Sequence, residues 1–415
     1  MLRQRDYAFL WVALLVMAVA TQMTAVAVGW QVYAIHRNPF DLGLIGLAEF
    51  VPLPLLALPA GHVADRFPRR FVFAISLVVE IAVTALLLVV SLAGARQLWP
   101  FLALATATGV AGALGSPAGR AIPPELVPTD LLASAMALRS IAGQAAVVGG
   151  PAVGGVLFAV RPELVYGLAI GLLAVGLGCV LALGAPRVAG RVARAGPAPG
   201  LAGLLAGIGF IRRTPVMLGA ISLDLFAVLF GGAVALLPVF ARSILHTGPA
   251  GLGVLRSAPA VGALVAGALI ARRPLRSHAG RTLLVVVALF GASMVVFGLS
   301  RWFALSIVAL AVSGFADMIS MNIRSTTVAL ATPDALRGRV NAVEMVFISA
   351  SNELGAFESG VAASLLGAMP AVVAGGALTI AIAAVWPRLF PPLARIDRLE
   401  ELQPAAADAA GSDAG

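Results

Sequence analysis

The sequence predicts an all-α membrane protein with twelve transmembrane helices in two pseudo-symmetric bundles of six. The first observation behind this prediction is composition: 60% of the 415 residues are hydrophobic and only 11% are charged, whereas soluble domains carry about 25% charged residues. The second is that the apolar residues form runs long enough to cross a bilayer, which takes about 20 residues at the helical rise. Lipid can cover this much apolar surface, and a soluble fold cannot.

The predicted spans are separated by short polar loops. They cover residues 8–34, 42–64, 71–93, 98–118, 130–160, 162–184, 214–240, 249–271, 281–300, 302–328, 338–368 and 369–387. The separation of the fifth span from the sixth depends on Arg161-Pro162, and that of the last two depends on Pro370. The residue before a proline is disfavoured in a helix, so these positions mark helix boundaries.

Arginines predict the orientation of the spans. With the N-terminus inside, twenty arginines fall in inner loops and termini, and five fall in outer loops. The outer ones are Arg37, Arg96, Arg161, Arg242 and Arg301. Positive charge favours the cytoplasmic side. We therefore expect a multi-pass protein of the cytoplasmic (inner) membrane with both termini in the cytoplasm.

A polar stretch rich in Arg, Gly and Pro, residues 186–214, divides the chain. It predicts an N-terminal bundle over 1–185, a cytoplasmic linker over 186–213, a C-terminal bundle over 214–388 and a disordered cytoplasmic tail over 389–415. Within the linker, Leu201–Ile211 is expected to form a short helix on the membrane surface. Corresponding loops of the two halves are weakly similar in sequence, as expected of the internal repeats of secondary transporters.

Several classes of protein are disfavoured. The net charge is +9, but the arginines are spread over short loops, so we read them as topology signals and expect no nucleic-acid partner. Cys179 is the only cysteine, and the four histidines are dispersed, so neither a disulfide framework nor a metal site is expected. The sequence contains no P-loop and no Gly-x-Ser-x-Gly motif. We predict that the chain is not an enzyme and binds no cofactor.

One loop combines an acid with several arginines. It follows the second predicted span and contains Gly61, Asp65, Arg66, Arg69 and Arg70. The glycine lets two helices approach closely, and the aspartate can cap a helix or pair with an arginine, which would make a breakable latch. A plain positive-inside loop is the alternative. The spacing resembles the loop 2–3 signature of the major facilitator superfamily.

The fifth span contains a second motif, with Gly150, Pro151, Gly154 and Gly155. Small residues allow tight helix packing, and proline permits bending. The motif resembles the glycine-proline motif of antiporters in the same superfamily, with ordinary small-residue packing as the alternative. Many such antiporters also carry an arginine in helix 4, and this chain has none over Ala103–Gly109.

Further stretches narrow the resemblance, from about residue 8 to 386, to the enterobactin-exporter-like (transmembrane secretion effector) branch. They are Val28–Tyr33, Ala121–Leu132, Ala135–Leu138 and Arg337–Asn341. The resemblance implies the major facilitator fold, in which helices 1, 4, 7 and 10 line a central cavity.

Ionisable and polar residues inside spans are costly in lipid and usually mark function. The candidates for contact with a substrate or a coupling proton are Asp224, Asp317, Arg324, Glu353, Glu49, Arg139, Gln31 and Asn322. Burial favours the neutral form of a carboxylic acid, so Asp224, Asp317 and Glu353 are the favoured proton carriers. Arginine–carboxylate pairing between helices, or polar packing, is the alternative for each. Glu80 and Arg256 are expected to be structural, and Glu344 to be solvated.

The resemblance and these residues together predict a secondary active transporter that works by alternating access. Proton-coupled export of a small amphipathic compound, siderophore-like or drug-like, is the leading hypothesis, with the lipid bilayer, protons and the substrate as partners and a monomer as the expected state. Three alternatives remain: an importer working by symport, a lipid flippase, and a membrane receptor or scaffold that transports nothing. Loading of substrate into everted vesicles would argue against the importer, and dependence on lipid composition would favour the flippase.

Overall fold

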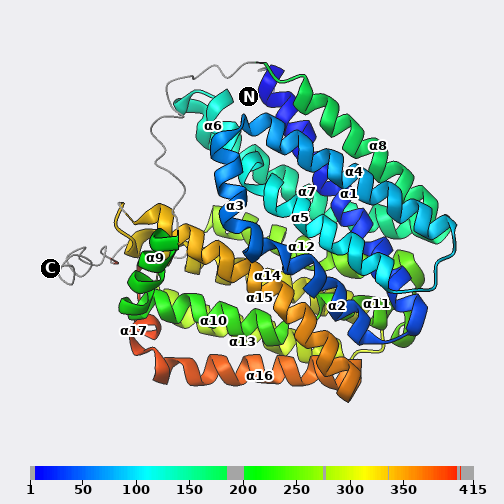
Figure 1. Cartoon of the computed structure of the whole chain (residues 1–415). Coiled ribbons are helices and arrows are strands. Elements are labelled where there is room, and N and C mark those ends of the chain that lie inside the picture. Colours follow the sequence, from blue (N-terminus) through cyan, green and yellow to red (C-terminus); the bar gives the residue numbers. More distant parts are fainter. Residues whose placement is uncertain (1–4, 185–200, 274–276, 335, 400–401, 403–415) are drawn as a thin grey trace. The chain divides into compact units, whose positions relative to one another are not determined.

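The computed structural model describes residues 5–184, 201–273, 277–334, 336–399 and 402. The described chain is almost entirely helical (Figure 1). Its first half forms α1 (Arg5–His36), α2 (Pro39–Phe50), α3 (Pro52–Arg66), α4 (Arg69–Leu92), α5 (Trp99–Ala121), α6 (Pro123–Leu126), α7 (Leu132–Val160) and α8 (Pro162–Leu181). The remainder forms α9 (Leu201–Arg213), α10 (Pro215–Gly231), α11 (Leu237–Val239), α12 (Gly248–Arg272), α13 (Ala279–Leu299), α14 (Phe303–Ala331), α15 (Arg337–Leu366), α16 (Ala368–Leu389) and α17 (Pro391–Ala394).

The prediction of an all-α membrane protein is confirmed. In the described chain, eleven helical segments are long and apolar enough to cross a membrane. The remaining predicted span, residues 338–368, corresponds to α15, which has 30 residues but carries Glu344, Glu353 and Glu358. The two splits predicted at prolines also match the helix bounds, since Arg161 separates α7 from α8 and Gly367, at φ +89°, separates α15 from α16.

Two predicted spans are interrupted. The span predicted over 42–64 is two helices, because α2 ends at Phe50 and α3 begins at Pro52. The span predicted over 214–240 stops at Gly231, where Gly232 adopts an extended conformation with φ −77° and ψ 112°. A 3₁₀ turn (Val234–Leu236), the short α11 and a π-helical turn (Phe240–Ile244) follow. Proline in the first case and paired glycines in the second explain the breaks.

The described chain divides into two compact units. Unit 1 contains residues 1–198 together with Leu237–Ser257, and unit 2 contains residues 199–236 together with 258–415. The predicted boundaries differ, because they assign Leu237–Ser257 to the C-terminal bundle. The division into six-helix bundles therefore stays a prediction.

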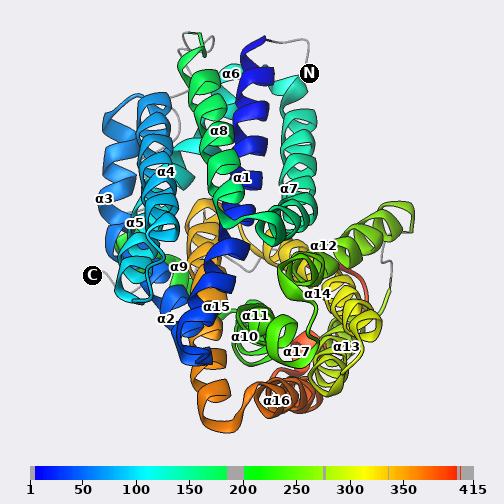
Figure 2. The ribbon, with the colours of Figure 1, turned by 90° about the vertical axis from the view of Figure 1, so that its right-hand side faces the viewer.

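Unit 1 is built around α1, which packs against α7 and α8, while α4 packs against α5 and α8. Figure 2 shows α1 between α7 and α8. The core on this side contains Tyr7, Leu10, Phe73 and Leu77, all at most 2% exposed. Tyr7 donates a hydrogen bond to the Ala135 carbonyl at 2.6 Å, which ties the start of α1 to α7.

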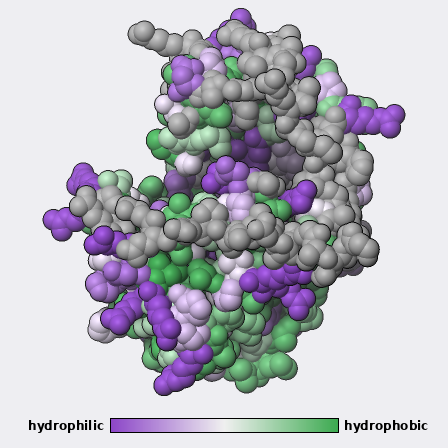
Figure 3. Space-filling view, turned by 90° about the vertical axis from the view of Figure 1, so that its left-hand side faces the viewer, coloured by the Kyte–Doolittle hydropathy of each residue, from purple (hydrophilic) through white to green (hydrophobic). Residues whose placement is uncertain are grey.

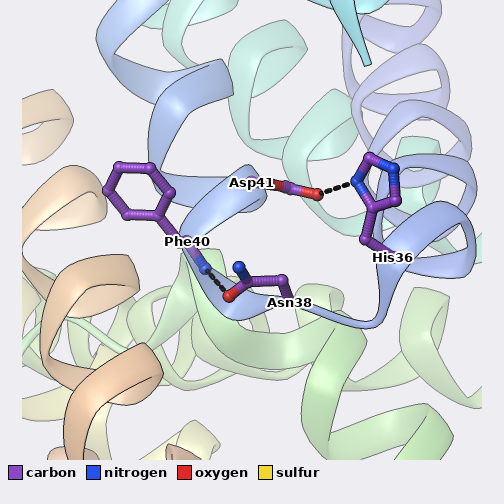
Figure 4. A network of polar contacts seen from close by, with 4 residues as sticks. All are labelled: His36, Asn38, Phe40 and Asp41. Atoms are coloured by element: carbon purple, nitrogen blue, oxygen red, sulfur yellow. Dashed lines mark hydrogen bonds and ion pairs between the residues drawn. The ribbon is translucent and has the colours of Figure 1, made fainter. Parts of the chain in front are cut away.

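The turn between α1 and α2 has its own polar network (Figure 4). The Asn38 side chain accepts a hydrogen bond from the Phe40 amide at 3.0 Å and so caps α2. His36 Nδ1 lies 2.9 Å from Asp41 Oδ2, and Asp41 is buried in the first turn of α2. A carboxylate is favourable at a helix N-terminus, so both contacts fix the angle between the two helices.

The segment Leu237–Ser257 belongs to unit 1 through specific contacts. The Tyr33 and Ser243 hydroxyls are 2.8 Å apart, and the Arg242 guanidinium lies 5.4 Å from the centre of the Trp30 ring. Ser257 Oγ donates to the Val148 carbonyl at 2.6 Å. These contacts tie the start of α12 and the turns before it to α1 and α7.

Unit 2 packs α13 against α14 and α16, and α10 against α15 and α16. Its main core contains Leu223, Leu283, Ile323 and Trp386, and the Trp386 indole donates to the Gly219 carbonyl at 2.9 Å. The predicted short helix in the linker is present as α9, where Ile208 and Ile211 pack against the α10–α15 core. Its position on a membrane surface stays a prediction.

Part of the predicted disordered tail is ordered. Pro391–Ala394 form α17, and Leu393 and Ile396 are buried in the core of unit 2. The apolar residues after Pro392 supply enough buried surface to hold this turn in place. Residues 403–415 lie outside the described chain, as do residues 185–200 of the predicted linker.

Hydrophilic side chains gather on the face of unit 2 that carries α9 and α17 (Figure 3). The arginines that the sequence places in inner loops of this unit are exposed, namely Arg212, Arg213, Arg272, Arg273, Arg337, Arg339, Arg388 and Arg395. Their exposure is what the orientation prediction requires, and the orientation itself stays a prediction.

The glycine-proline motif lies in the middle of α7, and its glycines contact two neighbouring helices. A Cβ at Gly150 would lie 2.7 Å from the Gln22 Cβ, and one at Gly154 would lie 2.9 Å from the Met23 Cα, so both glycines face α1. A Cβ at Gly155 would lie 2.9 Å from the Gly253 Cα, so this glycine faces α12. Small-residue packing is therefore present at this motif.

Substituting two glycines of α7 tests this packing. Gly154→Ala is expected to lower the free energy of unfolding by about 1–3 kcal/mol, because the new methyl group meets the backbone of α1. Gly149→Ala is the matched control, since nothing lies within 4 Å of a Cβ there. It should be neutral or stabilising by up to about 1 kcal/mol through helix propensity. Thermal unfolding of the purified protein in detergent measures both, and equal midpoints for the two variants would contradict the packing.

Candidate functional site

A buried ion pair joins two helices of unit 2. Arg324 Nη1 on α14 lies 2.6 Å from Asp224 Oδ2 on α10, and the two side chains are only 8% and 10% exposed. Pairing between helices, one of the alternatives for Asp224, is therefore what the structure contains. An unpaired charge at this depth would be costly, and the two opposite charges neutralise each other.

Asp224, the acidic member of the pair, borders a small cavity. The cavity is lined by Asp224, Asp317 and Ser320 together with Ala227, Val228, Val286, Val287, Phe290 and Ala316. It has room for about one water molecule. Arg324 Nε is also buried and has no hydrogen-bond partner among the described residues. Arg324 thus keeps an unused donor at Nε, which a purely structural ion pair does not need.

Asp317 differs from its partners in exposure. It is exposed on α14 and starts a stripe at intervals of four residues that continues with Met321 and Ser325, which are exposed as well. An ionised carboxylate is expensive against lipid. The stripe is therefore the part of α14 best suited to face a water-filled pathway, and Arg324 lies about two helical turns after Asp317 on the same side of the helix.

Glu344 was misjudged from the sequence. We expected a solvated residue, yet it is half-buried on α15 and interacts electrostatically with Arg324 and Asp224. The helical periodicity of the sequence around Glu344 did indicate that this residue faces the interior. Glu344 shares one face of α15 with Val340, Phe347 and Ser351, of which Val340 and Ser351 are buried, so the face points into the unit.

The other candidates in unit 2 are not among the lining residues of this cavity. Asn322 on α14 and Glu353 on α15 are both half-buried. Aromatic side chains pack against one another nearby: the Phe226 ring stacks on Phe230 with centroids 6.3 Å apart and meets Trp386 edge-on at 5.9 Å.

The candidates in unit 1 have separate surroundings. Gln31 donates to Ser91 Oγ at 2.7 Å and accepts from the buried Tyr166 hydroxyl at 2.6 Å, so its amide links α1, α4 and α8. This favours the polar-packing alternative for Gln31. Glu49 on α2 and Arg139 on α7 are half-buried.

The arginines of the loop motif bind helix ends. Arg69 Nη1 donates to the Ala121 carbonyl at 3.2 Å, at the C-terminus of α5, and Arg70 Nη1 donates to the Leu183 carbonyl at 3.3 Å, just beyond α8. Positive charge is favourable at helix C-termini because their carbonyls are unpaired. Arg66 is exposed, and the surroundings of Gly61 and Asp65 lie outside what is described.

Among the described residues, no group of three or more His, Cys, Asp or Glu side chains could hold a metal ion.

The fold and its charged cluster define a multi-pass membrane protein of the transporter class. A family described as transmembrane secretion effector, within the major facilitator superfamily, has a sequence model that matches residues 1–406. The chain belongs to this family, and the resemblance stated from the motifs is confirmed.

Two relatives and one solved structure agree with this assignment. The chain is 26% identical over 365 residues, 84% of each protein, to the uncharacterised major-facilitator-type transporter YfiS of Bacillus subtilis. It is 28% identical over 136 residues, 32% of this chain and 34% of the relative, to the staphyloferrin A transporter of Staphylococcus aureus. The fold is similar, with a TM-score of 0.73 and 15% identity over 94% of this chain and 97% of the other, to a bacterial homologue of the human lysosomal transporter Spinster in an inward-facing, occupied conformation. The chain is accordingly a secondary transporter.

Breaking the buried pair tests its energetics. Arg324→Gln is expected to lower the free energy of unfolding by about 3–5 kcal/mol, because it leaves the Asp224 carboxylate buried without its partner. Asp224→Asn combined with Arg324→Gln should recover most of that loss, since neither charge remains. Thermal unfolding of both variants in detergent measures the coupling between the residues.

The control is the exposed pair of Arg337 and Asp334, whose atoms are 3.0 Å apart. Arg337→Gln should cost no more than about 1 kcal/mol, because solvent screens an exposed pair. A double variant at Asp224 and Arg324 as unstable as Arg324→Gln alone would refute the pairing.

Proposed function

We propose that this protein is a proton-coupled exporter of the cytoplasmic membrane that carries a small amphipathic compound, siderophore-like or drug-like, by alternating access. The observation that carries the proposal is the combination of an exposed acid, Asp317, with the buried Asp224–Arg324 pair, whose Asp224 lines the same cavity as Asp317. Its relationship to the staphyloferrin A transporter over a third of the chain supports a siderophore-like substrate.

In this mechanism Asp317 carries the coupling proton. Its carboxylate is accessible from the exposed face of α14, whereas Asp224 is already bound to Arg324 at 2.6 Å. When Asp317 loses its proton, the Asp224 carboxylate opposes the new negative charge, and the guanidinium of Arg324, which is bound to Asp224, offsets part of that repulsion. A polar or cationic group of the substrate then competes with a proton for the same carboxylate, which couples substrate release to protonation.

The stripe on α14 also suits an amphipathic ligand. Met321 offers a flexible apolar surface between the polar side chains of Asp317 and Ser325, and its side chain is 44% exposed. Pockets of this kind bind by apolar contact and use a few polar groups for orientation.

The proposal also covers the oligomeric state, the orientation and the helix contacts of the transporter. The protein works as a monomer with both termini in the cytoplasm. Arg69 and Arg70 then hold the cytoplasmic ends of α5 and α8, where breaking two hydrogen bonds to carbonyls would release a latch. Gly155 lets α7 lie against α12 at the backbone contact described above.

Replacing Asp317 tests the proton-carrying role. In energised everted vesicles that contain the protein, siderophores and amphipathic dyes are added one by one, and a pH-sensitive fluorophore reports proton efflux. A transported compound should dissipate the gradient in the parent protein. Asp317→Asn should abolish this response while retaining exchange of labelled against unlabelled compound, because exchange needs no net proton transfer. Asp317→Glu should restore part of the response.

Asp334→Asn is the control, since it removes a carboxylate from an exposed loop position, 87% exposed at the side chain. It should respond like the parent protein. An Asp317→Asn variant that still dissipates the gradient would exclude Asp317 as the proton carrier. Transport of the compound in the import direction, out of the everted vesicles, would exclude export.

A further inference from the structure

The end of α10 leaves polar backbone groups inside unit 2. The helix stops at Gly231, and Gly232 is extended. The Val228 carbonyl accepts a hydrogen bond from the Gly232 amide at 3.2 Å. The carbonyls of Leu229, Phe230 and Gly231 follow at the same helix end, where an α-helix has no intrahelical donors for its last four carbonyls.

Neighbouring helices enclose this end closely. A Cβ at Gly355 of α15 would lie 3.0 Å from the Val228 oxygen, and a Cβ at Gly375 of α16 would overlap the Phe230 oxygen. Both glycines therefore bring another backbone directly onto the end of α10. Ser359, one turn after Gly355, donates a hydrogen bond to the Gly232 carbonyl at 2.8 Å.

A second small cavity lies at this helix end. Its lining residues are Phe230, Gly231, Gly232, Ala233 and Leu236 at the break, Glu358, Ser359 and Ala362 from α15, and Ala371 and Val372 from α16. The lining contains one acid and no basic side chain. The cavity has room for about one water-sized occupant.

The electrostatics of the cavity favour a positive charge. A helix C-terminus carries about half a negative elementary charge, and the half-buried carboxylate of Glu358 lines the same space. Glu358 also lies eight residues from the end of α15, or about 12 Å along the helix, where an ionised side chain is expensive. Two negative groups without a neighbouring cation repel each other, and a small cation between them removes that penalty.

We propose that the break in α10 and Glu358 form a binding site for one sodium ion. The Glu358 carboxylate supplies the charged ligand, and the Ser359 hydroxyl and the carbonyls at the end of α10 supply neutral oxygens. Hard oxygen ligands select alkali and alkaline-earth cations, and a single carboxylate matches a single positive charge. Interrupted membrane helices bind coupling ions through such unwound carbonyls. The site is independent of Asp317 and of the proposed proton coupling.

Thermal unfolding in sodium chloride tests the site, with choline chloride at the same ionic strength as the reference. Sodium should raise the midpoint of the parent protein by several degrees, because a ligand that binds only the folded state stabilises it. Glu358→Gln should abolish the increase, and equilibrium binding of radioactive sodium to the parent protein should give one site per chain. Glu163→Gln, which removes an acid from the first turn of α8 in unit 1, should retain the full increase.

A milder variant keeps the test decisive if Glu358→Gln does not fold. Ser359→Ala leaves the carboxylate in place and should raise the sodium concentration for half-maximal stabilisation by about tenfold, the loss expected for one neutral ligand. Equal midpoints of the parent protein in sodium and choline, or an unchanged half-maximal concentration in Ser359→Ala, would overturn the proposal. Asp317→Asn should leave the sodium effect intact, so failure of the proton hypothesis and failure of the sodium site are distinguishable.

Discussion

Close backbone contact at small residues is the interaction on which the rest of this structure depends. Lipid is as apolar as a leucine side chain, so helices in a bilayer gain little from the hydrophobic effect when they associate, and they rely on packing at short range. In unit 2, Gly314 of α14 lies against the backbone of Pro259 on α12, and Gly291 of α13 lies against Gly376 of α16. These contacts fix α14 and α13, and only a fixed α14 can hold Arg324 at 2.6 Å from Asp224.

The polar groups within the units fall into two kinds. Those of the first kind have hydrogen-bond partners within the protein: Gln31 bonds to Ser91 and Tyr166, and Arg69 and Arg70 bond to carbonyls at the ends of α5 and α8. Those of the second kind have capacity left over, as at Arg324 Nε and at the end of α10 beside Glu358. Because an unmet polar group is costly away from water, the second kind is where we propose that the protein binds ions or substrate.

Much of the fold could be predicted from the sequence, because hydropathy and helix length alone determine which segments can span a bilayer. Pro162 and Pro370 marked the separations of α7 from α8 and of α15 from α16 to within a few residues. The break at Gly231–Gly232 could not be predicted, since two glycines in an apolar run serve a packed helix equally well. The pairing of Asp224 with Arg324 could not be predicted either. A hundred residues separate them, and no local pattern encodes which helices become neighbours. Glu344 was misjudged, and the partners of Gln31 could not be predicted, because the sequence shows that a residue is polar but not which neighbours its helix face meets.

The polarity of α15 affects how the chain is made. Its three glutamates lie in a helix of 30 residues, which is not among the eleven segments of the described chain that are apolar enough to cross a membrane. A single acidic residue near the middle of a helix costs about 2.5–3.5 kcal/mol when that helix leaves the translocon alone. α15 therefore enters the bilayer with help from helices synthesised before it, and α10, which contacts it and carries Asp224, has already been made. Insertion of α15 is therefore expected to depend on α10, so a substitution in α10 is expected to disturb insertion of the chain as well as its folding.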